Sequence, residues 1–395
     1  LSQRLLVDAE AATGTVRNGI HLPHHALTRA MAYDPIAEEL VILGRNGMLV
    51  TVDAGDWHTG ERFALTLDAP ASLGCSPDGL VVLDGNGQLL RLDTATGALR
   101  EVVAPHTPAV AIAASAAPLV HFASLPPSGS TAGGALEFKI AKTMNLANTR
   151  IRFKTTLDYH AVTAGRGATT VSRDFYSEPV ELALPPPPYV YVANTGDDTV
   201  GVIDTTLETP DLVARIPVGR GPCDLVVAGA ERLLMVTNSG DGTLSIVSTQ
   251  TMAELDMEPA TPNTLDRVSL GGSPGPIAIN PRKPFVYIGD LNRPVLYEVG
   301  LGSLTSGLAH DLSDALAGVS LTSFTGLAVT SDGQYVFLAT PGAASWRGDD
   351  SVGTPGYLLR WDTETRMVTG SVAVGPKPFG LRAIPRRDAA ALGKD

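Results

Sequence analysis

A run of residues that recurs along the second half of the chain constrains the fold more than any other feature. The stretch YVYVANTGDDTVGVID, residues 189–204, restarts as ERLLMVTNSGDGTLSIVST, which places Asn194 and Asn238 at equivalent positions about 44 residues apart. PFVYIGDLNRPVLYEVG and QYVFLATPG follow the same plan, with Asp290 and Thr340 at that position. Self-similarity at such a spacing is typical of a fold assembled from repeated supersecondary units.

Each unit contains four short apolar runs separated by turn residues. The units end in similar ways, as in IPVGRGPCDLVV, VSLGGSPGPIAIN and VAVGPKPFGLRAI, where glycines precede a proline and a new apolar run. This pattern predicts the four-stranded blade of a β-propeller. We name the strands of a blade A to D from the centre outward, so that A follows the Gly-Pro turn and B carries the YVYVAN type of run.

The series YVAN, DDTVGVID, IPVG and GP resembles the YVTN family of β-propeller repeats. The resemblance is strongest over residues 189–385. SPDG at Ser76 to Gly79 with the following LVVLDGNGQLLRLDTATGALREVV, and TSDGQYVFLA from Thr330, are similar to the same repeat. The resemblance implies a propeller of the kind found in bacterial and archaeal surface, periplasmic and secreted proteins.

The runs predict an all-β fold, a seven-bladed β-propeller. Six blades are expected at 27–67, 71–104, 108–116 with 188–219, 220–271, 273–320 and 323–375. The seventh would combine PFGLRAI, near the C-terminus, with RLLVDAEAATGTVRNGI from the N-terminus, which closes the ring and leaves no sheet edge at the join. Propeller blades thus occupy residues 1–116 and 189–385, and residues 386–395 form a tail.

The segment 117–188 interrupts the repeat and is expected to be an inserted β module. Its runs LVHFAS, GALEFKIA, TRIRFKTTLDYHAV and FYSEPVELAL alternate like strands of a small β-sandwich. SEPVELAL resembles the closing strand of a fibronectin type III-like module, and Pro185 to Pro188 would form a stiff linker. Such an addition is a place where partner specificity could reside.

Composition excludes some classes of partner. The formal net charge of −12 argues against a nucleic-acid backbone as partner, because that binding depends on clustered Lys and Arg. The most apolar stretch, Pro108 to Ser124, is short for a membrane span and contains Pro118 and His121. The chain begins Leu-Ser-Gln without Met, so we expect that its true start is missing, either by processing or because the chain is a piece of something longer.

The two cysteines, Cys75 and Cys223, have no metal-binding or redox spacing. A disulfide between them is one interpretation. We favour two free, partly buried thiols, because free cysteine behaves as a small buried hydrophobe.

The candidate binding residues lie in turns that a propeller brings together on one face. B-to-C turns and D-to-A crossings emerge on one face of a propeller, because successive strands alternate in direction. The carboxylates there could bind Ca²⁺, and the basic groups could bind an anionic ligand or an acidic partner loop. The alternative, which we favour for the carboxylates, is that Asp, Asn and Gly supply turn conformations; the basic residues would then be solvated loop charges. The candidates are Asp197, Asp198 and Asp241, with Asp84 and Asn86, from B-to-C turns, and Arg220, Lys377 and His106 from D-to-A turns.

The densest histidine cluster is HLPHH, with His21, His24 and His25. These are candidate metal ligands, but neighbouring His24 and His25 would point apart in an extended segment, so we expect no metal site. The chain has 8 His and no haem-attachment motif. No cofactor is expected.

Catalytic signatures are absent from the sequence: there is no GxSxG elbow. The A strands offer mostly small apolar residues to the central channel, with Asp224 as the chief exception. We therefore expect a non-catalytic scaffold that binds another protein, within a cell-surface or periplasmic assembly. The alternatives are a lactonase-like hydrolase, the propeller subunit of a periplasmic redox enzyme, or a purely structural module of a longer surface protein.

Overall fold

The fold is known from a computed structural model of residues 1–395. It describes residues 5–9, 16–21, 28–34, 37–53, 57–65, 67, 70–76, 79–92, 98–103, 111–114, 150–151, 154–163, 166–176, 180–181, 189–204, 211–228, 232–257, 266–302, 304, 307–342, 344–347, 350–375, 378 and 380–383. The chain divides into two compact units, Leu1–Ala117 with Pro188–Asp395, and Pro118–Pro187.

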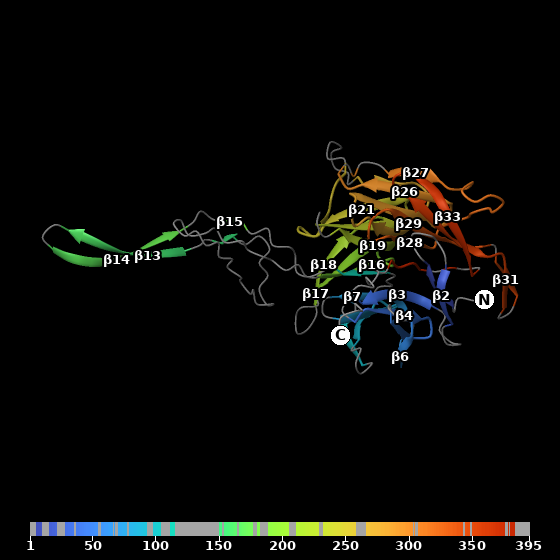
Figure 1. Ribbon diagram of the computed structural model, residues 1–395, viewed down its shortest axis with the longest axis horizontal. Helices are drawn as coiled ribbons and strands as arrows, with labels where there is room; N and C mark the ends of the chain where they lie inside the picture. The colour runs from blue at the N-terminus through green and yellow to red at the C-terminus, as the bar shows by residue number, and fades with distance from the viewer. Residues whose placement is uncertain are drawn as a thin grey trace. The chain divides into compact units, whose positions relative to one another are not determined.

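In its described residues the first unit contains six antiparallel blades, whose strands are drawn in Figure 1. The first three are blade 1, with β3 (Thr28–Asp34), β4 (Glu39–Gly44), β5 (Met48–Asp53) and β6 (Thr59–Ala64); blade 2, with β7 (Pro70–Ser76), β8 (Gly79–Asp84), β9 (Leu89–Leu92) and β10 (Leu99–Val103); and blade 3, with β11 (Ala111–Ala114), β16 (Tyr189–Asn194), β17 (Thr199–Asp204) and β18 (Asp211–Pro217).

The other three blades follow in the second half of the chain. They are blade 4, with β19 (Pro222–Ala228), β20 (Leu233–Asn238), β21 (Thr243–Ser248), β22 (Ala253–Glu254) and β23 (Val268–Ser269); blade 5, with β24 (Pro274–Ile279), β25 (Phe285–Asp290), β26 (Val295–Gly300) and β27 (Gly307–Asp311); and blade 6, with β28 (Gly326–Val329), β29 (Tyr335–Thr340), β32 (Gly356–Asp362) and β33 (Met367–Val374).

The first strands of successive blades lie side by side in the order β3, β7, β11, β19, β24 and β28. This arrangement makes them the innermost strands of a propeller. The unit is therefore an all-β propeller that shows six blades in its described residues.

Burial along each blade follows strand position. Every residue of β16, YVYVAN, is buried, because both faces of a B strand pack against neighbouring blades. The outermost strand β33, MVTGSVAV, alternates between exposed and half-buried residues, as expected for a rim strand with one solvated face. The burial pattern of a strand therefore depends on its distance from the propeller axis.

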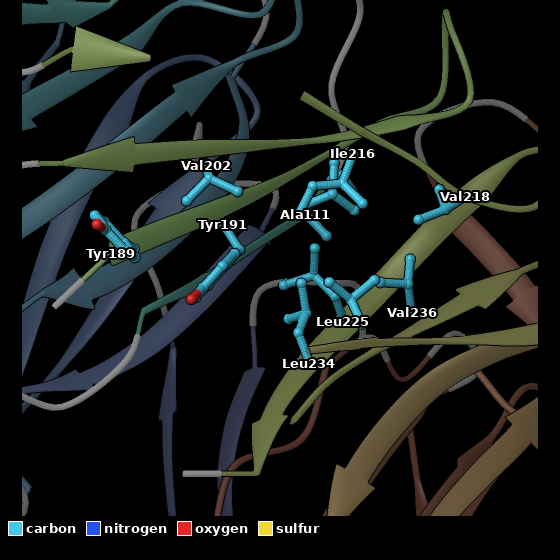
Figure 2. Packing of buried hydrophobic residues seen from close by; sticks show 12 residues of the cluster. Ala111, Tyr189, Tyr191, Val202, Ile216, Val218, Leu225, Leu234 and Val236 are labelled. Carbon is cyan, nitrogen blue, oxygen red and sulfur yellow. The ribbon is translucent and has the colours of Figure 1, made fainter. Parts of the chain in front are cut away.

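The hydrophobic core of the described residues consists of separate clusters, five of which fill the space between two blades, while a sixth lies on blade 1 alone. Figure 2 shows the cluster between blades 3 and 4, where Tyr191 and Val202 of blade 3 lie near Leu225 and Leu234 of blade 4. Similar clusters join blades 1 and 2, 2 and 3, 4 and 5, and 5 and 6. A fully buried side chain of this size stabilises the fold by about 1.5–3 kcal/mol relative to an exposed one.

Blade 3 is assembled from two distant segments. Its innermost strand β11 pairs antiparallel with β16, with Ala111 opposite Ala193 and Ala114 opposite Val190. The pairing of 108–116 with 188–219, predicted from the repeat, is confirmed by this ladder. The second unit therefore takes the place of the A-to-B turn of blade 3.

Within the second unit the described strands form two-stranded ladders. β13 (Lys154–Thr163) pairs with β14 (Arg166–Tyr176), and β12 (Arg150–Ile151) pairs with β15 (Val180–Glu181). The predicted β-sandwich-like fold of 117–188 stays a prediction, because its first two runs lie outside the described residues.

The ends of the chain contribute a hairpin and a short segment to the first unit. β1 (Leu5–Ala9) pairs with β2 (Val16–His21). The segment 378–383 contacts blades 6 and 1: Thr325 Oγ1, next to β28, donates a hydrogen bond of 2.8 Å to the backbone oxygen of Pro378, and Arg382 Nε donates one of 3.1 Å to that of Met31 in β3.

Candidate functional site

The candidate site is one end of the propeller, which we call the B-to-C face. It comprises the B-to-C turns 45–47, 85–88, 195–198, 239–242 and 291–294 and the D-to-A crossings 218–221 and 270–273. In blade 6 the B-to-C connection is longer and forms an extra hairpin, β30 (Ala344–Arg347) with β31 (Asp350–Gly353). The B-to-C face is therefore built of short rigid turns, with one projecting hairpin.

Four of the predicted binding residues meet where blade 3 crosses into blade 4. The backbone N–H of Arg220 donates to Asp241 Oδ2 at 2.7 Å, and that of Gly221 donates to Asp198 Oδ1 at 2.8 Å. Asp197 pairs with Arg215 at 2.8 Å. Asp198 and Asp241 therefore hold the crossing against the turns on either side of it, whereas Asp197 joins its turn to β18. Their contacts match the turn-forming role that the sequence analysis favoured, although the binding role is not tested by them.

Equivalent turns have equivalent backbones. Asp198 has φ +56° and Gly242, its counterpart in blade 4, has φ +71°. A left-handed residue is tolerated best by Gly, Asn and Asp, which explains the composition of these tips. Thr199 and Thr243 also match, because each donates its hydroxyl to the aspartate two residues earlier, at 2.6 and 2.7 Å.

The position that ends strand B is polar and completely buried in several blades. Asn194, Asn238, Asp290 and Thr340 are all 0% exposed. Asn238 Nδ2 donates to Thr243 Oγ1 at 3.0 Å and to Ser245 Oγ at 2.9 Å. These bonds join the end of strand B to strand C of the same hairpin. A buried amide without such partners would cost about 1–3 kcal/mol.

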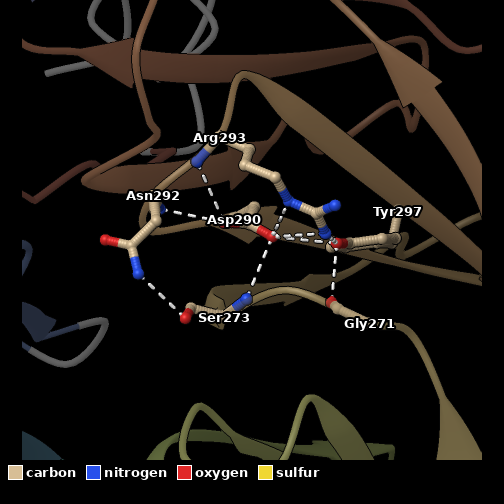
Figure 3. A network of polar contacts seen from close by, with 6 residues as sticks. All are labelled: Gly271, Ser273, Asp290, Asn292, Arg293 and Tyr297. Atoms are coloured by element: carbon tan, nitrogen blue, oxygen red, sulfur yellow. Dashed lines mark hydrogen bonds and ion pairs between the residues drawn. The ribbon is translucent and has the colours of Figure 1, made fainter.

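Asp290 forms the most extensive of these networks (Figure 3). Its carboxylate accepts hydrogen bonds from the backbone N–H groups of Asn292 at 2.9 Å and Ser273 at 3.1 Å, and it pairs with Arg293 at 3.0 Å. The Tyr297 hydroxyl lies 2.8 Å from Asp290 Oδ2, and Arg293 donates to that hydroxyl. Burial raises the pKa of Asp290, but these donors outweigh it, so the pKa lies below its usual range.

The remaining candidates from the sequence are only partly covered by the structure. Lys377, His106, His24 and His25 lie outside the described residues. For His21 the backbone is described as the last residue of β2. Asp84 is 3% exposed and accepts a hydrogen bond of 3.2 Å from the backbone of Asn86, which is the pattern of a turn.

Asp224, the predicted exception among the innermost strands, occupies a place where the ladder of the next blade is irregular. The pairing of β24 with β25 shifts between Pro274 and Ile277, and Asp224 Oδ2 accepts a hydrogen bond of 3.1 Å from the Ile277 N–H. Its Oδ1 accepts from Leu225 N at 2.9 Å. Burial raises the pKa of Asp224 to about 6, against these hydrogen bonds and the charge of Arg382. Both oxygens therefore have backbone partners.

Cys223 is free and half-buried, as predicted. Its thiol lies 3.3 Å from Thr237 Oγ1 and donates to the Pro274 oxygen at 3.2 Å, and burial raises its pKa to about 11. A thiol kept protonated in this way is a poor nucleophile. The side chain of Cys75 lies outside the described residues.

Sequence reasoning missed two arginines of blade 1. Arg29 follows the first residue of β3, and Arg45 is in the B-to-C turn after β4. Both lie in the half of the chain where the repeat is weaker, and only the strand register brings them together. The sequence offered no signal for this pair, because the proximity of the two arginines depends on the register of β3 with β4.

Two kinds of feature are absent from the described residues. No three His, Cys, Asp or Glu side chains among them are grouped so that they could hold a metal ion. None of the described segments forms a helix long and apolar enough to cross a membrane.

Comparisons with known proteins agree with the architecture. No family model matches the chain, and no curated protein matches it either. Among solved structures, it is similar to the β-propeller domain of Cps50 (Swd1) from Myceliophteria thermophila, with a TM-score of 0.54 and 12% sequence identity over 93% of each chain. At this identity the likeness extends to the fold alone. The chain is a β-propeller protein.

Proposed function

We propose that this chain is a non-catalytic β-propeller platform that binds another protein through its B-to-C face. The observation that carries the proposal is that the crossings and turns of this face are joined to one another by charge-assisted hydrogen bonds. Examples are the bonds from the backbone N–H of Arg220 to Asp241 and from that of Ser273 to Asp290. A surface held rigid before binding loses little conformational entropy when a partner docks. Propellers are common platforms for protein interaction, and this general tendency supports the assignment.

The B-to-C face also carries features suited to contact. Leu291 is 38% exposed in the B-to-C turn of blade 5, although it is apolar. The hairpin β30–β31 extends the same face in blade 6. An apolar side chain among polar turns is the composition of an interface with an anchor and a polar rim.

The contacts of Asp224 favour the platform over the hydrolase alternative. A catalytic carboxylate is directed at a substrate, whereas a structural one satisfies backbone donors of the fold. Both oxygens of Asp224 instead accept backbone hydrogen bonds, one of which satisfies an N–H at the irregularity in β24. Its raised pKa follows from burial at this structural position.

The proposal includes a seventh blade that closes the ring. Blade 1 has a buried apolar face with Leu40, Ile42 and Val50, each 2% exposed or less, on the side opposite the cluster it shares with blade 2. Apolar side chains that are buried to this extent must be covered by another part of the protein. The segment 378–383 and the hairpin β1–β2 would supply it, as innermost and outer strands respectively.

A recurring contact supports this role of 378–383. At the start of blade 2 the Pro70 oxygen accepts a hydrogen bond from Arg29 of blade 1, and at the start of blade 5 the Pro274 oxygen accepts one from Cys223 of blade 4. The Pro378 oxygen accepts in the same way from Thr325, at the start of blade 6. This likeness supports the proposal that Pro378 is the first residue of a following blade.

The YVTN resemblance extends the proposal to the cellular setting. Repeats of this type imply a bacterial protein at the cell surface or in the periplasm, where the chain would act as a scaffold in a larger assembly. The proposed division is propeller at 1–116 and 189–385, an inserted module at 117–188 and a tail at 386–395. The inserted module would add specificity for the partner.

Co-purification from the native source tests the function. A Leu291→Glu variant places a charge on the B-to-C face, and Glu364→Lys changes an exposed charge in the C-to-D turn of blade 6, at the other end of the blades. We expect a partner that purifies with the wild-type chain to be reduced roughly tenfold or more by Leu291→Glu and to be kept by Glu364→Lys. Unchanged recovery with a folded Leu291→Glu protein, or a wild-type chain that purifies alone, contradicts the proposal.

A further inference from the structure

Two arginines share one corner of the B-to-C face. Thr28, the first residue of β3, pairs with Gly44, the last residue of β4. Arg29 directly follows Thr28, where the register shifts, and Arg45 directly follows Gly44. The ladder therefore places the two residues beside each other at the B-to-C end of blade 1.

The contacts of Arg29 leave part of its guanidinium available. Its Nε donates to the Pro70 oxygen at 3.2 Å, and the side chain is half-buried. Burial lowers the pKa of Arg29, and the charge of Arg45 lowers it further, so the two guanidinium groups are close enough to repel. Arg45 is exposed and extends from the turn that Gly47 N closes onto the Gly44 oxygen.

Neither arginine has a carboxylate partner among the described residues. Three other described arginines differ in this respect, since Arg215 pairs with Asp197, Arg293 with Asp290 and Arg366 with Glu298. A pair of like charges without a carboxylate partner among the described residues, one of them half-buried, is unfavourable in the free protein. In a chain of net charge −12 this is also a local reversal of sign.

We propose that Arg29 and Arg45 form a subsite that binds carboxylate side chains from an acidic segment of the partner protein. This inference rests on the proposed function and names the chemistry of its partner. A guanidinium presents N–H groups in a planar fork that matches a carboxylate, and a carboxylate between two of them relieves their repulsion. The subsite would also steer an approaching acidic segment, because the net negative charge of the chain repels that segment while the two arginines attract it.

Binding of a labelled hexaglutamate peptide, followed by fluorescence anisotropy at low and physiological salt, tests the subsite. We expect the wild-type chain to bind the peptide, with an affinity that falls as salt rises. Arg45→Gln removes one charge without touching any described contact, and Arg29→Gln keeps a donor for the Pro70 oxygen; each should weaken binding about tenfold. The matched control is Arg282→Gln, at an exposed arginine in the A-to-B turn of blade 5, which should bind the peptide as the wild type does.

Three results would overturn the inference. One is a wild-type chain that does not bind the peptide, and another is an Arg282→Gln variant that loses as much affinity as Arg45→Gln. The third is competition by inorganic phosphate at concentrations equal to the peptide's, which would make the corner a site for small free anions. Thermal unfolding of each variant shows that it is folded.

The outcome is separable from that of the proposed function. If a partner is lost with Leu291→Glu but the peptide does not bind, the platform stands and the carboxylate subsite is wrong. If the peptide binds and depends on both arginines while no partner depends on the B-to-C face, the subsite is real and the platform is wrong.

Discussion

Arg382 Nε lies 3.1 Å from the backbone oxygen of Met31, so a residue near the C-terminus is hydrogen-bonded to the innermost strand of blade 1. The same segment accepts a hydrogen bond from Thr325, beside blade 6. Together the two contacts join the last described blade to the first. In a propeller such a join removes the open edges of the ring, which would otherwise be sites of aggregation.

Removing the closing segment should therefore destabilise the whole ring. We expect truncation after Gly375 to lower the melting temperature strongly and to promote aggregation, because the buried face of blade 1 with Leu40 and Ile42 would be exposed. Truncation after Pro385 should change the free energy of unfolding by less than about 0.5 kcal/mol. Differential scanning calorimetry of the two truncated chains makes the comparison, and equal stability would count against closure by 378–383.

Asp224 should make stability depend on pH. Its folded pKa, about 6, lies above the unfolded value, so its contribution to stability is complete below about pH 4 and is lost as pH rises through 6. The stability difference between wild type and Asp224→Asn should therefore shift by up to about 3 kcal/mol, against the wild type, between pH 4 and pH 8. Urea unfolding at several pH values measures this difference. If the stability of the two proteins changes with pH in the same way, the pKa of Asp224 is not raised in the folded state.

Gly271 and Gly272 offer a matched pair in one crossing. Both have positive φ, +72° and +68°. A Cβ on Gly271 meets nothing within 4 Å, whereas one on Gly272 would lie 2.2 Å from Asp290 Oδ2. We expect Gly271→Ala to cost about 1 kcal/mol from backbone strain, and Gly272→Ala to cost about 1–3 kcal/mol more. Chemical denaturation measures the free energy of unfolding of both variants. Equal losses of this free energy would show that the Asp290 network adapts to the added Cβ without cost.

The ion pair between Glu298 and Arg366 should couple blades 5 and 6. Glu298 is 4% exposed, accepts a hydrogen bond of 2.7 Å from Arg366 Nη2, and lies 3.4 Å from His310 Nε2. Arg366→Ala leaves a buried carboxylate without its charged partner and should cost about 3 kcal/mol. The same change in a Glu298→Gln background should cost much less, and a double-mutant cycle without coupling would contradict this account.

Cys223 should react slowly in the folded protein. Its pKa, raised by burial to about 11, leaves about a hundredfold less thiolate at pH 8 than an ordinary thiol has. In a Cys75→Ser background, where it is the only cysteine, alkylation by iodoacetamide should be slow when folded and fast in denaturant. Similar rates in the two states would show that the thiol is not shielded.

The repeat in the sequence was sufficient to predict the six described blades and their order, but not the extra hairpin β30–β31. The equivalence of Asn194, Asn238, Asp290 and Thr340 predicted four strand ends, and these residues end β16, β20, β25 and β29. The period alone identified them, because in a propeller each unit packs only against its neighbours. The split of blade 3 followed from the same logic, since the run at 109–114 had no nearby partner.

What the sequence could not reveal are contacts between units. The backbone N–H of Arg220 meets Asp241, and Gly221 meets Asp198, only when neighbouring blades pack. Arg29 and Arg45 become a pair through the register of β3 with β4, and nothing in the spacing of charges identifies that register. The composition of a turn predicts its backbone, whereas the partner of its side chain depends on tertiary structure.

Photo-crosslinking in the native source tests most directly the claim that the B-to-C face binds another protein. A benzophenone side chain would replace Asn86 or Leu291 on that face, or Arg282 or Glu364 in turns at the opposite end of the blades. The account predicts that the same protein is crosslinked from Asn86 and Leu291 and from neither control position. Crosslinking from Arg282 or Glu364 alone, or none from any position, would contradict it.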